Sequence, residues 1–239
     1  MKVAILLVGQ PRFFRQNDTI LELKNKYDAD VFIHTWNIKE SNKYVSPYAP
    51  TIWNSTPKDV EEYILKYEPK EYLIEDELTE EFINSNFIDR EITRYSHPAS
   101  KNNLYRWFYS VNKCADLAMK HSYDVYIIVR PDLLIHRLPE IDSDKIMSPT
   151  IHNHDETLPS HYIEISLMSV PNKYIEEYIN IINRFDEYYD KGYGYAHDHM
   201  PFAHLYESGL INNTRQYNLN DFYWRLIRSE DGSIMHSLH

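Results

Sequence analysis

The sequence has a single cysteine, Cys114, and no long hydrophobic run. One cysteine excludes an internal disulfide framework, and its place in a helical pattern predicts a small buried hydrophobic residue. The apolar run from Val3 to Val8 is far too short to cross a bilayer. It is followed by Gly9 to Arg12, where a signal peptide would need small residues for cleavage. We therefore expect no transmembrane segment and a cytoplasmic compartment.

Positive charge and glycine are also scarce. The 239 residues include 25 Lys and Arg against 36 Asp and Glu, for a net charge of -11, and only 5 Gly. A non-specific nucleic-acid binder needs a basic face, so this class is excluded, and any phosphate must be held by a few local groups. The 43% hydrophobic and 26% charged content is that of a globular protein. We expect one domain over residues 1–239.

The chain opens with a β-α-β pattern. Lys2 to Val8 is an unbroken apolar run typical of a strand buried on both faces of a parallel sheet. Phe14 to Tyr27 has the spacing of a covering helix, and Ala29 to Thr35 predicts a second buried strand. Residues 37–56 are polar and aperiodic, which predicts a long loop of the kind that is usually functional.

The later pattern alternates helices with short strands. The best amphipathic helix, Leu104 to His121, leads into a fourth strand, Tyr123 to Val129. The other predicted helices are 57–67 with Thr56 as N-cap, 78–87, 171–189 and 201–207, and the other predicted strands are 71–74, 133–136, 145–147 and 163–170. The sequence therefore predicts an α/β fold with a mostly parallel central sheet flanked by helices.

Polar clusters follow two of these strands. Gly9-Gln10-Pro11-Arg12 offers close backbone approach and a guanidinium suited to a pyrophosphate or a base edge, although a plain turn is an equal alternative. Arg130 and Asp132 follow the fourth strand and can hold a divalent cation and a diphosphate, or form a buried ion pair that merely closes the strand. The G-x-G-x-x-G and P-loop motifs are absent.

Histidines and aspartates form two further clusters. Asp198 lies between His197 and His199 after a glycine-broken segment, so it is a candidate general base or metal ligand. A plain surface loop is an equally weighted alternative. The group His152, His154 and Asp155 is weaker because no strand end anchors it.

Four segments together resemble a known family. GQPRFF after the first strand, DVFIHTW in the second, YDVYIIVRPDLLI around the fourth and the late HDHMPFAHLYESG resemble small bacterial and viral GT-A glycosyltransferase-like proteins. These include proteins related to lipopolysaccharide-synthesis transferases, and the resemblance covers most of the chain in order.

The resemblance implies a Rossmann-like GT-A fold and a nucleotide-diphosphate sugar as donor, with a glycan or another hydroxyl compound as acceptor. It implies that the nucleotide contacts Gly9, Gln10, Arg12, Thr35, Trp36 and Arg130. Most GT-A enzymes carry Asp-x-Asp after the fourth strand to hold Mn²⁺ or Mg²⁺. Here Asp132 matches the last carboxylate and Arg130 replaces the first, which puts metal dependence in question.

The late segment of the family maps onto Asp198 and His199. The resemblance implies that Asp198 is the catalytic base, and that His199 is a further metal contact or a phosphate donor. Two alternatives stay open. One is a metal-dependent hydrolase built from the His and Asp clusters, whose spacings match no zinc signature. The other is a non-catalytic module that binds a nucleotide or glycan.

Overall fold

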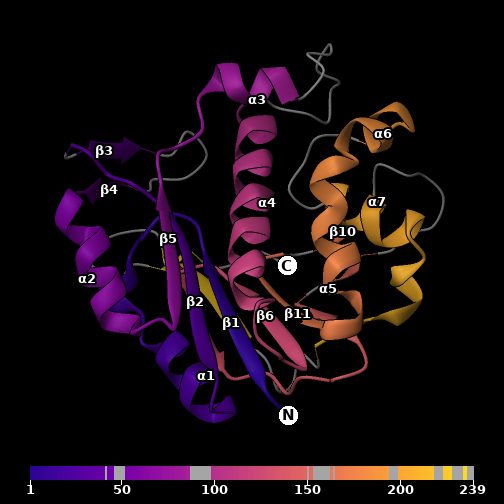
Figure 1. The fold of residues 1–239 in the computed structure, drawn as a ribbon, viewed down its shortest axis with the longest axis horizontal. Helices are drawn as coiled ribbons and strands as arrows, with labels where there is room; N and C mark the ends of the chain where they lie inside the picture. The colour runs from indigo at the N-terminus through magenta and orange to yellow at the C-terminus, as the bar shows by residue number, and fades with distance from the viewer. Residues whose placement is uncertain are drawn as a thin grey trace.

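The computed structural model describes residues 1–40, 42–45, 52–86, 98–149, 151–152, 162–163, 165–193, 199–217, 223–227 and 234–235. Its centre is a seven-stranded sheet in the order β12-β8-β11-β6-β1-β2-β5. Every strand of this sheet runs in one direction except β11, which is antiparallel to both of its neighbours. Helices flank the sheet (Figure 1). The α/β class and the mostly parallel sheet predicted from the sequence are confirmed.

The strands of the main sheet are β1 (Val3–Val8), β2 (Asp30–Trp36), β5 (Glu71–Glu75), β6 (Val125–Val129), β8 (Ile146–Ser148), β11 (Leu167–Pro171) and β12 (Thr214–Gln216). A three-stranded antiparallel sheet joins β7 (Leu133–Arg137) to β13 (Tyr223–Ile227) and β14 (Ile234–Met235). Two further pairs are β3 (Asn42–Val45) with β4 (Ile52–Ser55) and β9 (Ile151–His152) with β10 (Tyr162–Ile163).

The helices are α1 (Thr19–Tyr27), α2 (Pro57–Tyr67), α3 (Glu80–Asn86), α4 (Pro98–Ala118), α5 (Asn172–Ile179), α6 (Phe185–Asp190) and α7 (His199–Glu207). Short 3₁₀ turns cover Phe14–Gln16, Asn180–Asn183 and Leu210–Asn213. Within the described ranges, no helix is both long enough and apolar enough to cross a membrane.

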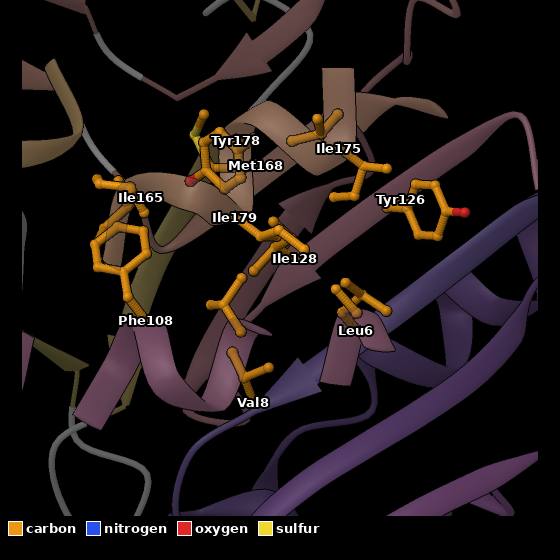
Figure 2. Close-up of a cluster of buried hydrophobic side chains, with 14 of the residues drawn as sticks. Leu6, Val8, Phe108, Tyr126, Ile128, Ile165, Met168, Ile175, Tyr178 and Ile179 are labelled. Atoms are coloured by element: carbon orange, nitrogen blue, oxygen red, sulfur yellow. The ribbon is translucent and has the colours of Figure 1, made fainter. Parts of the chain in front are cut away.

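Alternation along β1 divides the core between the two faces of the sheet. Ala4, Leu6 and Val8 face the layer of α4, α5, α6 and α7, and Figure 2 shows Leu6 and Val8 among the side chains of that cluster. Val3, Ile5 and Leu7 face α1, α2 and β7. All six side chains are at most 1% exposed, as expected for a strand buried on both faces. Cys114 is buried in the α4 layer, as predicted, and burial raises the pKa of its thiol.

Several predicted boundaries were wrong. The helix predicted over 14–27 is broken at Asn17, whose side chain bonds elsewhere. The strand predicted over 163–170 is split into β10 and β11, and the strand pair β3 and β4 lies within the predicted loop 37–56. The helix α4 begins at Pro98, six residues before the predicted start, since proline fits the first turn of a helix.

The helix predicted over 171–189 is also interrupted. The chain leaves the helical conformation at Arg184, between the 3₁₀ turn Asn180–Asn183 and α6. Asn183 donates its side-chain amide to the Asn180 carboxamide oxygen at 2.9 Å.

Candidate functional site

Two polar loops leave the sheet side by side at its carboxyl edge. β1 and β6 are parallel neighbours with Leu7 opposite Val129, so Gly9 to Arg12 and Arg130 to Asp132 start at the same level. From β1 the chain passes through α1 to β2, which lies along one edge of β1. Later α4 leads the chain to β6, which lies along the opposite edge of β1. The strand order reverses between β1 and β6. Open α/β sheets bind their ligands beyond the carboxyl ends of the strands at such a reversal point.

The loop after β1 has an unusual backbone. Gly9 has a φ of 99° and Phe13 a φ of 52°, and the second value is costly for a bulky residue. Phe13 is held there because its ring is buried with Ile38, Val60 and Leu134. Strained positions that the surrounding packing fixes tend to cluster at functional sites. The loop is therefore a preformed structure.

Arg12 is oriented within this loop by Gln10. Its Nε and Nη2 donate to the Gln10 Oε1 at 3.1 and 2.8 Å, and its backbone N donates to the Gln10 carbonyl at 2.7 Å. Arg12 is half-buried. A guanidinium has five N–H donors, and this contact uses one edge of the fork. Gln10 thus presets the direction of the Arg12 side chain.

The loop after β6 contains a forked ion pair. Arg130 donates from Nε to Asp132 Oδ1 at 2.8 Å and from Nη2 to Oδ2 at 2.7 Å. The Asp132 residue is only 2% exposed, whereas the Arg130 side chain is 29% exposed. Paired geometry of this kind is the strong, directional form of a charge-assisted bond. The contact is the ion pair that the sequence left as one alternative.

A divalent cation does not fit these residues as they stand. Both oxygens of Asp132 already accept bonds from Arg130, and a cation would have to displace the guanidinium. Elsewhere in the described ranges there is no group of three or more His, Cys, Asp or Glu side chains that could hold a metal. The role of Asp132 as a metal ligand remains a prediction.

Asn17 joins the two loops and was missed by sequence reasoning. It is fully buried, and its amide donates to the carbonyls of Pro131 at 2.8 Å and Leu133 at 2.7 Å. Its Oδ1 accepts from the backbone N of Thr19 at 3.1 Å. The loop after β1 is thereby fastened to the loop after β6. An asparagine just before a predicted helix could have suggested a turn, but not this distant partner.

We expect Asn17→Ala to destabilise the fold by about 2–4 kcal/mol, because it removes both buried amide–carbonyl bonds to the loop after β6 and the acceptor of the Thr19 N–H. Urea unfolding would measure the loss. The matched control is Asn183→Ala, which removes an exposed amide and is expected to change stability by less than about 0.5 kcal/mol. A loss no larger than that of the control would contradict the fastening role of Asn17.

The end of β2 forms a buried aromatic cluster. Thr35 is fully buried, and its hydroxyl has no hydrogen-bond partner among the described residues. Trp36 is 4% exposed and stacks on Tyr109 of α4, with ring centroids 5.8 Å apart and an interplanar angle of 22°. Their predicted contact with a nucleotide is not tested by this geometry.

A buried histidine next to Trp36 reaches a carboxylate on the neighbouring strand. His34 lies 2.7 Å through Nδ1 from the Ser110 hydroxyl and 2.9 Å through Nε2 from Glu75 Oε2. Burial lowers the pKa of His34, which favours the neutral ring. An ionised carboxylate only accepts, so we assign the proton to Nε2, and Ser110 then donates to Nδ1.

Glu75 is a second residue that sequence reasoning missed. It ends β5 at the same edge of the sheet, its side chain is 31% exposed, and its other oxygen lies 3.5 Å from the Tyr109 hydroxyl. Glu75 lies level with the end of β2, since Trp36 and Glu75 are register partners.

The structure describes only part of the two clusters of histidine and aspartate. Asp198, His197, His154 and Asp155 lie outside the described residues, and the side chain of His152 is likewise not described. His199 is the first residue of α7 and is half-buried, and burial lowers its pKa. The helix α7 contacts β10 and the 3₁₀ turn Leu210–Asn213. The roles predicted for Asp198 and His199 therefore stay predictions.

Fold and site together define a doubly wound α/β protein with two polar loops where its strand order reverses. No family model and no curated protein matches the chain. Among solved structures it is similar to "a glycosyltransferase involved in the glycosylation of the major capsid of PBCV-1". The identity is 10% and the TM-score 0.42, over 91% of this chain and 83% of that chain. Similarity at this level does not assign an activity.

Proposed function

We propose that this protein is a glycosyltransferase that uses a nucleotide-diphosphate sugar. The observation that carries the proposal is the register of β1 with β6, which brings Arg12 and Arg130 to adjacent strand ends at the reversal of strand order. Two guanidiniums at neighbouring strand ends suit a diphosphate, because guanidinium N–H groups bind phosphate oxygens. Asp132 offsets the charge of Arg130, so Arg12 supplies the net positive charge of the two loops, which in a chain with a net charge of -11 favours a phosphorylated ligand.

The neighbouring strand ends suit the nucleoside part of such a ligand. Adjacent strands lie about 4.8 Å apart, so the end of β5 is about 10 Å from the end of β1. There Glu75 is held by His34 and keeps part of its carboxylate exposed. A fixed carboxylate can accept hydrogen bonds from ribose hydroxyls. We propose that Glu75 performs this role, together with the contacts predicted for Thr35 and Trp36.

We propose that the bound diphosphate carries a sugar because of the sequence resemblance. In the reaction, the acceptor oxygen forms a bond to the anomeric carbon while the bond from that carbon to the diphosphate breaks. The electron pair of the broken bond stays on the diphosphate, and the acceptor proton passes to a base, which we propose is Asp198. Donors preset toward the leaving oxygens would stabilise the developing charge.

A binding screen tests the proposal. Thermal unfolding would be followed with UDP, GDP, ADP, CDP and dTDP and with their glucose, galactose or mannose conjugates, each with 1 mM EDTA or 1 mM MnCl₂. A bound ligand stabilises the folded state by about 2.7 kcal/mol at a hundred times its Kd. No stabilisation by any compound would contradict the proposal. Binding without turnover of a sugar nucleotide over a range of glycan acceptors would favour the non-catalytic module.

We expect Arg12→Ala to weaken binding of the stabilising nucleotide diphosphate roughly ten- to a hundredfold, because one charge-assisted contact is lost. Calorimetry would measure the affinity. The control is Arg15→Ala, three residues along, since Arg15 is turned to Asp59 and Glu62 of α2. Its affinity is expected to be unchanged. Equal affinities for the Arg12 variant and the wild type would remove this loop from the site.

A further inference from the structure

We infer that the Arg130 guanidinium takes the place of a divalent cation, so that this site binds its donor diphosphate without metal and stabilises the departing charge through Arg130. The inference rests on the proposed function and concerns how that function is carried out. Its basis is the forked pair between Arg130 and Asp132 at the carboxyl end of β6.

The pair has a buried end and an exposed end. Asp132 is almost fully buried and has both oxygens turned to Arg130, whereas nearly a third of the Arg130 side chain is accessible. The buried carboxylate thus fixes the guanidinium at its inner edge. In this arrangement Asp132 is a positioning residue, and Arg130 is the group that meets the ligand.

The loop that carries the pair is fixed by hydrogen bonds from the Asn17 side chain. Pro131 lies between the two residues and is buried, and its carbonyl accepts the Asn17 amide at 2.8 Å. The Leu133 carbonyl accepts the same amide at 2.7 Å. Turning Asp132 outward to face a cation would break this fixed turn as well as the ion pair. The described geometry therefore keeps the carboxylate inside.

The charges also balance. Where Asp-x-Asp holds a divalent cation, two carboxylates of charge -1 offset the +2 of the ion. Arginine in place of the first carboxylate changes the charge at that position from -1 to +1. This change of +2 equals the charge that the ion would bring. Arg130 with Asp132 therefore has the same net charge as a loaded Asp-x-Asp site. A guanidinium remains protonated at any working pH, so this charge is permanent.

The test compares nucleotide-diphosphate affinity with and without metal. The full chain, stripped with EDTA, would be titrated in a calorimeter with the nucleoside diphosphate found in the screen, first in 1 mM EDTA and then in 1 mM MnCl₂. We expect affinities within about threefold of each other. Affinity that appears only with manganese would overturn the inference but leave the proposed function intact. No binding in either buffer would contradict the proposed function, and the inference would fall with it.

Two variants make the test specific to Arg130. The double variant Arg130→Gln and Asp132→Asn removes both charges but keeps hydrogen-bonding groups, so no buried carboxylate is left unpaired. We expect it to lose roughly ten- to a hundredfold in affinity in EDTA. The single variant Arg130→Asp carries Asp-x-Asp, but the fixed turn keeps Asp132 inside, so it is expected to bind the diphosphate weakly both with and without manganese. Unchanged metal-free affinity in the double variant would overturn the inference.

The chain offers a matched control. Arg184 forms the same forked pair with Glu187, at 2.9 and 3.0 Å, and its side chain is 26% exposed. It lies beside α6 in the helical layer and not at a strand end. The variant Arg184→Gln is expected to bind the nucleotide like the wild type. Circular dichroism and a melting curve would show that each variant folds before its affinity is compared.

Discussion

Asp198→Asn is expected to reduce glycosyl transfer by about 10²- to 10⁴-fold while leaving nucleotide-diphosphate affinity within a few-fold of wild type. Removal of a general base costs a factor of this order, because the acceptor hydroxyl then has no group to take its proton. The base acts on the acceptor and not on the donor, so donor binding is spared. Asparagine keeps the shape of the side chain, which separates loss of the charge from loss of packing.

Initial rates of sugar transfer and calorimetric affinity would be measured on the same preparations. The control Asp190→Asn makes the same chemical change at an exposed residue of α6. It is expected to keep the wild-type rate. Wild-type transfer by the Asp198 variant would eliminate Asp198 as base. An equal loss of donor affinity would instead move Asp198 to the phosphate site together with His199.

The second large effect is a loss of stability in acid caused by His204. This residue is fully buried, lies 2.8 Å through Nδ1 from the Tyr188 hydroxyl, and lies 2.6 Å through Nε2 from the Glu177 carbonyl. Burial lowers the pKa of His204 from 6.5 to about 4. The unfolded chain therefore takes up this proton near pH 6.5, whereas the folded protein resists protonation until about pH 4.

Because the unfolded state binds the extra proton, the free energy of unfolding falls as the pH drops from 6.5 to 4. The total loss is about 3 kcal/mol, of which about 2 kcal/mol is lost by pH 5. Urea unfolding at pH 7 and pH 5 would measure it in the wild type and in His204→Gln, which cannot titrate. The variant should show a smaller fall between the two pH values. Equal falls would place the acid sensitivity at other groups, such as His34, whose pKa is also lowered.

The parts of the fold that could be predicted are those governed by local pattern. The unbroken apolar run Val3–Val8 is a strand buried on both faces, and Thr56 precedes a helix that starts at Pro57. In that helix the Asp59 carboxylate accepts the Thr56 backbone N–H at 2.5 Å, as in a capping box. The contacts that decide these elements lie within a few residues along the chain.

The parts that could not be predicted depend on distant partners. Asn17 breaks a helical pattern because it binds carbonyls more than a hundred residues away. The reversed direction of β11 follows from its pairing with β6 and β8, and no local spacing records direction. For the site, strand ends at Arg12 and Arg130 could be located from sequence. Glu75 could not, because its importance comes from the contact with His34.

The central position of β1 has a consequence for the growing polypeptide. β1 is synthesised before both of its neighbours in the sheet, and β2 at Asp30–Trp36 can pair with one of its edges early. Its other edge pairs with β6, which is not made until Val125–Val129. Until then the Val3–Val8 edge keeps unpaired backbone groups on a strand of six apolar residues, which is a template for wrong pairing. The stage of synthesis before β6 is made is thus the one at which wrong pairing of β1 is most expected.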